Sequence, residues 1–300
     1  MERQSTDLVG TAVVRPPGAV SRFLKASARA FQKNPNMLAG AVILVVMATI
    51  AIFAPLIAHQ DPVRLHGADR FQPPSSRYWF GTDHVGRDVY ARTIYGSRIS
   101  LLVGASVAAI VASAGTVIGL IAGYFRTADS VVMRFMDGIM AFPTLLLALA
   151  LIALLGGSVQ NVIIVISVVD TPRMARVVRG AVLMLRDQEF ITAARAIGVG
   201  PSRVMALHIL PNALAPIIVQ ATFVFASAVI VEASLSFLGA GTPPEIPTWG
   251  NIMGVGRTYI QIALWITFFP GLFLSLTALA INLMGDGLRD ALDPRLARRA

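Results

Sequence analysis

The chain has 300 residues, of which 55% are hydrophobic and only 14% are charged. A soluble protein of this length rarely needs so much apolar surface, whereas helices that face lipid do. Cysteine is absent, which excludes disulfides, thiolate metal sites and thiol nucleophiles. The formal net charge is +9. The basic residues lie between apolar stretches and not on one aromatic-rich face, which favours membrane orientation over nucleic-acid binding.

The apolar stretches predict an all-α polytopic membrane protein with about six transmembrane helices. Residues 37–58 carry no charge and are long enough to cross the hydrocarbon core. The fourth stretch is purely apolar only over 162–169, so that span must continue past Asp170 with arginines at the headgroup level. The predicted spans are 37–58, 99–125, 138–155, 161–179, 213–240 and 260–284. They form a transmembrane domain over 37–285, with a long loop over 59–98 and tails over 1–36 and 286–300.

The distribution of arginine and lysine predicts the orientation. With both termini in the cytoplasm, 18 of the 25 basic residues fall on cytoplasmic segments and seven on outer loops. Cytoplasmic segments of membrane proteins are enriched in these residues. We therefore expect cytoplasmic amino and carboxyl termini.

One segment, residues 187–212, is too polar for lipid and is predicted to be cytoplasmic. Its alanine-rich first half predicts a short helix that stops at Gly198 and Gly200, because glycine readily adopts the left-handed conformation that ends helices. Ser202 is predicted to cap a second helix that ends before Pro211.

Small residues in the first of these helices, Ala193, Ala194 and Gly198, would let it enter a groove on another protein closely. From these features alone, both a docking helix and an ordinary cytoplasmic loop remain open.

The same segment resembles the EAA loop of ABC importer permeases. The matching residues are Ala193, Ala194, Gly198, Ile209, Leu210 and Pro211. Thr192 stands where the family usually has glutamate, so an ion pair from this position would have to come from Glu189 or Arg195. The resemblance implies that the segment is the coupling helix that sits in a cleft of the ATPase subunit.

Three further segments, 80–104, 232–253 and 282–296, are similar to the C-type subunit of the dipeptide/oligopeptide permeases, as is the shorter 175–180. The resemblance implies a type I ABC importer transmembrane domain in the bacterial inner membrane that imports di- or oligopeptides. It also implies three kinds of partner: a second homologous permease, two ABC ATPases and an extracytoplasmic substrate-binding protein. Relatives also carry nickel, glutathione or heme.

The first of these segments contains a Gly-Thr-Asp-x-x-Gly-Arg-Asp signature. Its residues are Gly81, Thr82, Asp83, Gly86, Arg87 and Asp88. A catalytic aspartate or a phosphate loop is disfavoured, because no histidine or lysine is placed by spacing to assist. We expect a turn on the outer face in which Asp83, Asp88, Arg87 and Arg92 satisfy one another.

Glu232 is the one acidic residue well inside an apolar span, and an ionisable group at depth is a functional candidate. Two interpretations stay open. Glu232 either lines the pathway or its gate, or forms a structural hydrogen bond with Ser234 or Ser236.

Two further patterns favour plain structural roles. Gly115, Gly119 and Gly123 are spaced by four and predict close helix packing. The histidines of the 59–98 loop, His59, His66 and His84, are more typical of a solvated loop than of a metal site, so no metal is expected.

The chain contains no Gly-Lys pair, so it lacks the loop with which P-loop ATPases bind nucleotide. We expect no catalytic residue and no cofactor bound by this chain, with ATP and Mg²⁺ on the partner ATPases. The rival hypotheses are a gradient-driven secondary transporter or channel, and a membrane hydrolase. The first predicts paired intramembrane charges or inverted repeats, and the second a catalytic constellation; neither pattern is found.

Overall fold

The computed structural model describes residues 34–292, which contain helices and no strands. The long helices are α2 (Pro35–Ile52), α4 (Val89–Tyr124), α5 (Arg126–Met140), α6 (Thr144–Leu155), α7 (Val159–Arg186), α10 (Leu210–Phe237) and α12 (Trp265–Leu292). The short elements are α3 (Ala54–Ile57), η1 (Gly67–Asp69), α8 (Glu189–Ala196), α9 (Pro201–Val204), η2 (Met205–Ile209), α11 (Trp249–Gly256) and η3 (Arg257–Tyr259). Most of both predicted tails lies outside the described residues.

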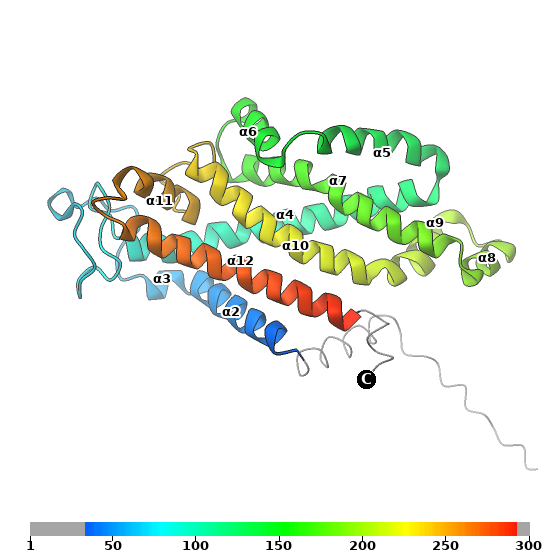
Figure 1. The fold of residues 1–300 in the computed structure, drawn as a ribbon, viewed down its shortest axis with the longest axis horizontal. Coiled ribbons are helices and arrows are strands. Elements are labelled where there is room, and N and C mark those ends of the chain that lie inside the picture. Colours follow the sequence, from blue (N-terminus) through cyan, green and yellow to red (C-terminus); the bar gives the residue numbers. More distant parts are fainter. Residues whose placement is uncertain (1–33, 293–300) are drawn as a thin grey trace, which may run out of the picture.

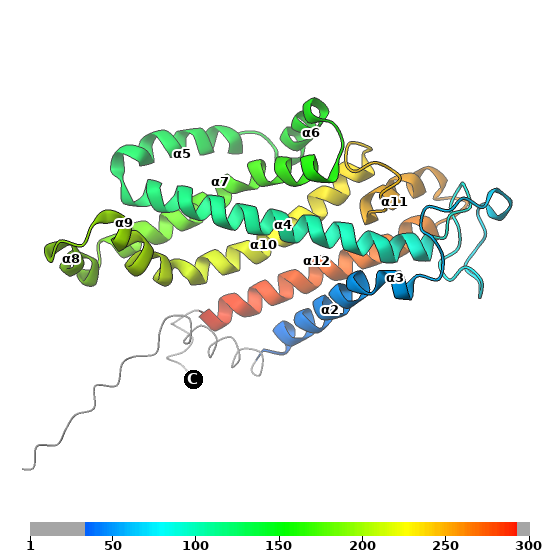
Figure 2. The same cartoon turned by 180° about the vertical axis from the view of Figure 1, so that it is seen from behind.

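The helices form an elongated bundle. α4, α7 and α10 lie in its centre, α2 and α12 pack together on one side, and α5 and α6 lie on the opposite side (Figures 1 and 2). One end carries the 58–88 loop and α11, and we call it the α11 end. The other carries α8 and α9, and we call it the α8 end (Figure 1).

Membrane-crossing length and apolarity are clearest in four helices: α2, α4, α12 and the continuous helical stretch Pro201–Phe237 that contains α10. The pair α5 and α6 gives a fifth span if it is counted as one. α7 is long enough at 28 residues, but it carries Asp170 and several arginines. Helices therefore lie at all six predicted positions, but within the described residues only four of them, or five with the α5 and α6 pair, have the length and apolarity of a membrane span.

The predicted third span, 138–155, is not a continuous helix. α5 ends at Met140, α6 begins at Thr144, and the two axes meet at 89°. Pro143 explains the break, because it cannot donate to a helical carbonyl and disfavours helical geometry in the residue before it. Two other helices have bounds that differ from the predicted spans. α4 begins at Val89 rather than at residue 99, and α12 runs from Trp265 to Leu292 rather than over 260–284.

The three predicted packing glycines bring α4 against α7. A Cβ at Gly115 would lie 2.5 Å from Met174, and a Cβ at Gly119 would lie 2.6 Å from the Ala175 carbonyl oxygen. Gly123 meets Val182 in the same way at 2.6 Å. Only glycine permits these approaches, so the predicted close packing is confirmed and α7 is identified as the helix that fills the groove.

A Gly119→Ala substitution should destabilise the chain although alanine is the better helix former. Its methyl group collides with the α7 backbone, and overpacking of this kind costs about 1–3 kcal/mol. Gly180→Ala is the matched control, since a Cβ there has open space around it and the change should be neutral or slightly stabilising. The midpoints of thermal unfolding in detergent measure both effects. Equal midpoints for the two variants would contradict the packing.

Candidate functional site

The segment after α7 folds into the two short helices α8 and α9 at the α8 end of the bundle. Glu189 lies in the first turn of α8, where the positive end of the helix dipole stabilises its carboxylate. It ends as predicted at Gly198, which has a φ of +84°, and the Gly198 and Val199 amides return to the carbonyls of Arg195 and Ala194 at 3.0 and 3.1 Å. Gly200 has an ordinary φ of −64°, so only one of the two glycines supplies the left-handed turn.

The two sides of α8 differ sharply. Ile191 and Ala194 are buried against the bundle, together with Val204 and Ile209. The opposite side exposes Phe190 and Ala193, and the exposed fraction reaches 82% at Ile197 just after the helix. Ala194 was predicted to lie among the small residues of a free face, and this is wrong because it packs inward. The free surface of α8 is instead partly apolar, which is unusual for a helix that protrudes from its own bundle.

Thr192 lies on the exposed side of α8, where the family usually has glutamate, and its hydroxyl donates only to the Gln188 carbonyl at 3.4 Å. The Arg195 guanidinium lies over the ring of Tyr124, 4.9 Å from its centroid. Within the described part of the chain neither Glu189 nor Arg195 forms an ion pair. Arg195 therefore ties α8 to the end of α4 rather than replacing the missing glutamate.

The second half of the segment differs from the prediction. α9 starts at Pro201 with Gly200 before it, so Ser202 lies inside the helix and is not its cap. The helix also does not end before Pro211. It continues through the wide turn of η2, in which the Leu210 amide bonds to the Met205 carbonyl, directly into α10. Pro211 follows directly after this wide turn, in the first turn of α10.

A continuous helical stretch thus runs from Pro201 into the bundle, with the wide turn of η2 and Pro216 within it. Ile209 is fully buried, Leu210 is partly buried, and Pro211 follows at the start of α10. α9 therefore leads without a loop into the central helix α10, and residues 197–200 join α8 to α9.

The Gly-Thr-Asp-x-x-Gly-Arg-Asp signature forms a tight turn at the α11 end. Asp83 accepts bonds from the Val85 and Arg87 amides at 3.0 and 2.9 Å and from the Arg87 guanidinium at 2.6 Å. Gly86 has a φ of +81°, and any Cβ there would collide with the His66 carbonyl. The carboxylate of Asp83 therefore stabilises the turn in which it lies.

The rest of the signature joins this turn to its surroundings. Gly81 packs against Trp265, whose indole donates to the Thr82 carbonyl at 3.1 Å. The Thr82 hydroxyl donates to the Asp69 carbonyl. Asp88 caps α4 by accepting from the Tyr90 amide at 2.9 Å, and burial raises the pKa of this carboxyl.

Of the predicted mutual pairing of Asp83, Asp88, Arg87 and Arg92, only the pair of Asp83 and Arg87 is confirmed. Arg87 pairs with Asp83, whereas Asp88 caps a helix. Arg92 is buried and donates to the carbonyls of Pro62 and Pro244 at 3.2 and 3.1 Å. Arg92 thus joins two loops that are far apart in the sequence.

Glu232 is fully buried where α10 meets α4 and α11. Its carboxylate accepts from Ser236 at 2.8 Å and from Ser100 of α4 at 3.2 Å, while Ser234 donates to its own helix instead. The Ser100 hydroxyl in turn accepts from the amide of Trp249, the first residue of α11, at 3.4 Å. This network joins three helices and favours the structural interpretation of Glu232.

The loop histidines are used in packing. The His59 ring contacts Trp79 edge-on, and the His84 ring stacks on Tyr259. Burial lowers the pKa of His84, which keeps its imidazole neutral near pH 7. The described residues contain no group of three metal-ligating side chains.

A ladder of charged contacts between α5 and α7 could not be predicted from the sequence. Arg179 pairs with Asp129 through two bonds of 2.5 and 2.7 Å, and Arg176 pairs with Asp137 at 2.5 Å. Asp170 is buried beside this ladder, 3.8 Å from the Arg173 guanidinium and without a hydrogen bond among the described residues. Two of the arginines predicted to lie at headgroup level, Arg176 and Arg179, thus bind α5 to α7.

The hydrogen bonds of Glu232 predict different outcomes for two substitutions. Glu232→Gln keeps the shape and one of the two acceptor oxygens, and a serine hydroxyl can turn to accept from the amide NH2, so uptake and stability should change little. Glu232→Leu leaves the Ser100 and Ser236 hydroxyls without their partner, which costs about 1–3 kcal/mol. The thermal midpoint and the yield of the assembled complex should therefore fall for Leu only, with Ser234→Ala as an unaffected control. Loss of uptake in Glu232→Gln at normal stability would instead favour a role in the pathway.

Comparison with known proteins identifies the family. Residues 115–298 match the family described as the binding-protein-dependent transport system inner membrane component. Residues 22–74 match the N-terminal transmembrane domain of oligopeptide transport permease C.

Individual relatives cover nearly the whole chain. A dipeptide transport system permease protein of Alkalihalophilus pseudofirmus is 45% identical over 266 residues, 88% of this chain and 88% of the relative. A di/tripeptide transport system permease protein of Pseudomonas aeruginosa is 42% identical over 284 residues, 92% of this chain and 94% of the relative. These matches, together with the helical bundle and its protruding α8 segment, make the chain a membrane permease subunit of the binding-protein-dependent ABC importer family.

Proposed function

We propose that this subunit imports di- or oligopeptides, using ATP hydrolysed by two partner ATPase subunits. The peptide cargo is inferred from the relatives, whose names specify dipeptide and di/tripeptide transport. The pathway would form between this bundle and a second, homologous permease, and an extracytoplasmic binding protein would deliver the peptide. The α8 end would face the cytoplasm and the α11 end the outside of the inner membrane.

The observation that carries the ATPase partnership is the free side of α8. Phe190 and Ile197 expose apolar surface at the tip of the bundle, and such surface is costly in water unless a partner covers it. Small Ala193 lies between them and would allow a partner to come close. α8 therefore has the shape and composition of a helix that docks into a groove.

The continuous helix from Pro201 to Phe237 provides the mechanical connection. Closure of the ATPases would displace α8 and α9, and the helix would pass this displacement to α10 and the bundle packed around it. Transport of this kind is a rigid-body switch between two packed states. The permease itself supplies shape and coupling, and the chemistry takes place on the ATPases.

Substitutions at the end of α8 test the coupling. Gly198→Ala forces a side chain into a φ of +84°, which costs about 1–2 kcal/mol, and Gly198→Trp adds bulk beside the docking surface. Peptide uptake and ATPase stimulation by the loaded binding protein should fall for Ala and vanish for Trp, while membrane insertion stays normal.

Gly200→Ala is the control for these variants, because its φ of −64° suits any residue. Full uptake by Gly198→Trp, with the ATPase subunits bound in normal amounts, would contradict the coupling role.

The orientation is tested with single cysteines, since the native chain has none. Ser75→Cys lies in the loop at the α11 end, and we expect a membrane-impermeant maleimide to label it in spheroplasts. Gly200→Cys, at the α8 end, should react only after permeabilisation. Labelling of Gly200→Cys in sealed spheroplasts would overturn the orientation.

A further inference from the structure

The three tryptophans of the chain differ in what their indoles contact. The indole N–H of Trp249 donates to the Thr93 carbonyl at 3.1 Å. That of Trp265 donates to the Thr82 carbonyl at the same distance. Trp79 is instead 52% exposed, and its indole N–H has no hydrogen-bond acceptor among the described residues. Trp79 therefore presents both apolar surface and a free donor to its surroundings.

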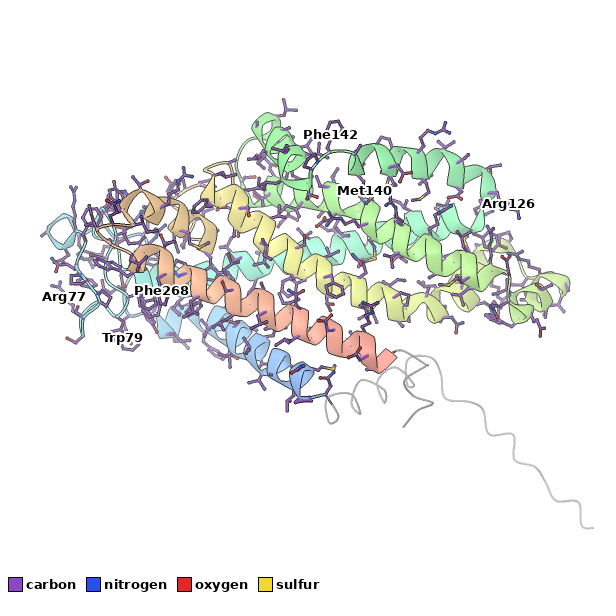
Figure 3. All side chains as sticks on the ribbon, viewed as in Figure 1. Arg77, Trp79, Arg126, Met140, Phe142 and Phe268 are labelled. Carbon is purple, nitrogen blue, oxygen red and sulfur yellow. The ribbon has the colours of Figure 1, made fainter. Side chains whose placement is uncertain are left out.

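Two neighbouring rings hold the Trp79 side chain in place. The His59 ring meets it edge-on with the ring centroids 5.2 Å apart, and the Tyr90 ring lies 4.9 Å away. His59 follows α3 by two residues, and buried Tyr90 lies in the first turn of α4. Trp79 is thus fixed beside the end of α3. Figure 3 shows it on the flank of the bundle formed by α2 and α3, with Arg77 farther toward the tip of the α11 end.

The flank that leads to Trp79 is uncharged and apolar. α2 contains no charged residue and has the length and apolarity of a membrane span. Large apolar side chains are exposed along α2 and onward into α3: Leu38, Val42, Val45, Val46, Ile52, Phe53 and Leu56. In a membrane protein, acyl chains suit an uncharged flank of this length. The surface of α2 and α3 is therefore continuous with the bilayer up to the point at which Trp79 begins.

The length of this flank sets the depth of Trp79 in the bilayer. At a rise of 1.5 Å per residue, α2 and α3 together extend about 34 Å, whereas the hydrocarbon core is about 30 Å thick. His59 therefore lies where the hydrocarbon ends and the headgroups begin, and the Trp79 ring beside it lies at the same level. Tryptophan is enriched at this level of membrane proteins, because its ring is apolar and its N–H still requires an acceptor.

We propose that Trp79 anchors the 58–88 loop to the bilayer. Its ring lies at the boundary between acyl chains and headgroups of the leaflet at the α11 end, and its N–H donates to an ester or phosphate oxygen of a phospholipid. The contact with Tyr90 passes this anchor to the first turn of α4, so the membrane surface fixes the depth of a central helix. The inference goes beyond the proposed function, because it depends on neither the cargo nor the ATPases.

The competing occupant is a soluble protein at the α11 end, and the position of Trp79 favours lipid. A protein that delivers cargo from the aqueous side would contact the tip of the bundle. Arg77 lies nearer to this tip, its side chain is 69% exposed, and it pairs with Asp69 at 3.5 Å (Figure 3). Trp79 lies instead on the flank that continues α2, at the depth of the headgroups. The charged residue thus faces the aqueous side and the aromatic one the bilayer.

Quenching of tryptophan fluorescence by brominated lipids tests the anchor, because bromine quenches only those rings that it can contact. The complete transporter is placed in nanodiscs of phosphatidylcholine whose acyl chains carry bromine either close to the glycerol or deep in the chain. The emission of Trp79 is the difference between the native complex and the Trp79→Phe complex. We expect the shallow bromines to quench this emission at least about twofold more strongly than the deep ones, as for a ring at headgroup level.

Two tryptophans introduced one at a time into the Trp79→Phe chain calibrate the depth. Val45→Trp, in the middle of α2, should be quenched most by the deep bromines, and Arg77→Trp should be quenched little by either lipid. Trp79 emission quenched as weakly as that of Arg77→Trp, or most strongly by the deep bromines, would overturn the proposal. Emission that changes with the loaded binding protein but not with bromine would assign Trp79 to that protein and would equally overturn it.

Discussion

The close approach of α4 to α7 is the constraint on which the rest of the structure depends. Gly115, Gly119 and Gly123 remove the side chains that would separate the two helices, so their backbones come into contact. In lipid, where apolar burial drives little association, such packing is a main source of helix–helix stability. It also fixes α7 so that its arginines reach Asp129 and Asp137 of α5.

Much of this architecture could be predicted from local signals in the sequence. The glycine spacing predicted close packing, Gly198 predicted the end of α8, and the apolar stretches predicted the long helices. Contacts between distant segments could not be predicted, because nothing in the sequence relates Arg179 to Asp129 or Arg92 to Pro244. The break before α6 did have a signal in Pro143, which was hidden by the apolar run around it.

Two buried acidic residues, Glu232 and Asp170, differ in the hydrogen-bond partners that surround them. Glu232 has Ser236 one helical turn away and Ser100 on α4, so both of its carboxyl oxygens accept hydrogen bonds. Asp170 has only the Arg173 guanidinium at 3.8 Å and no hydrogen bond in the described chain. The apolar residues around Glu232 mark it in the sequence, whereas the arginines that follow Asp170 hide the burial of that residue.

Reconstitution tests the central claim most directly, namely that this bundle transmits work done by ATPases and does not exploit an ion gradient. Purified complex in proteoliposomes would receive a labelled dipeptide and the binding protein on the α11 side, with ATP or no nucleotide on the α8 side. The account predicts uptake that requires both ATP and the binding protein and persists when ionophores collapse every ion gradient. Uptake that continues without ATP and stops with ionophores would contradict it.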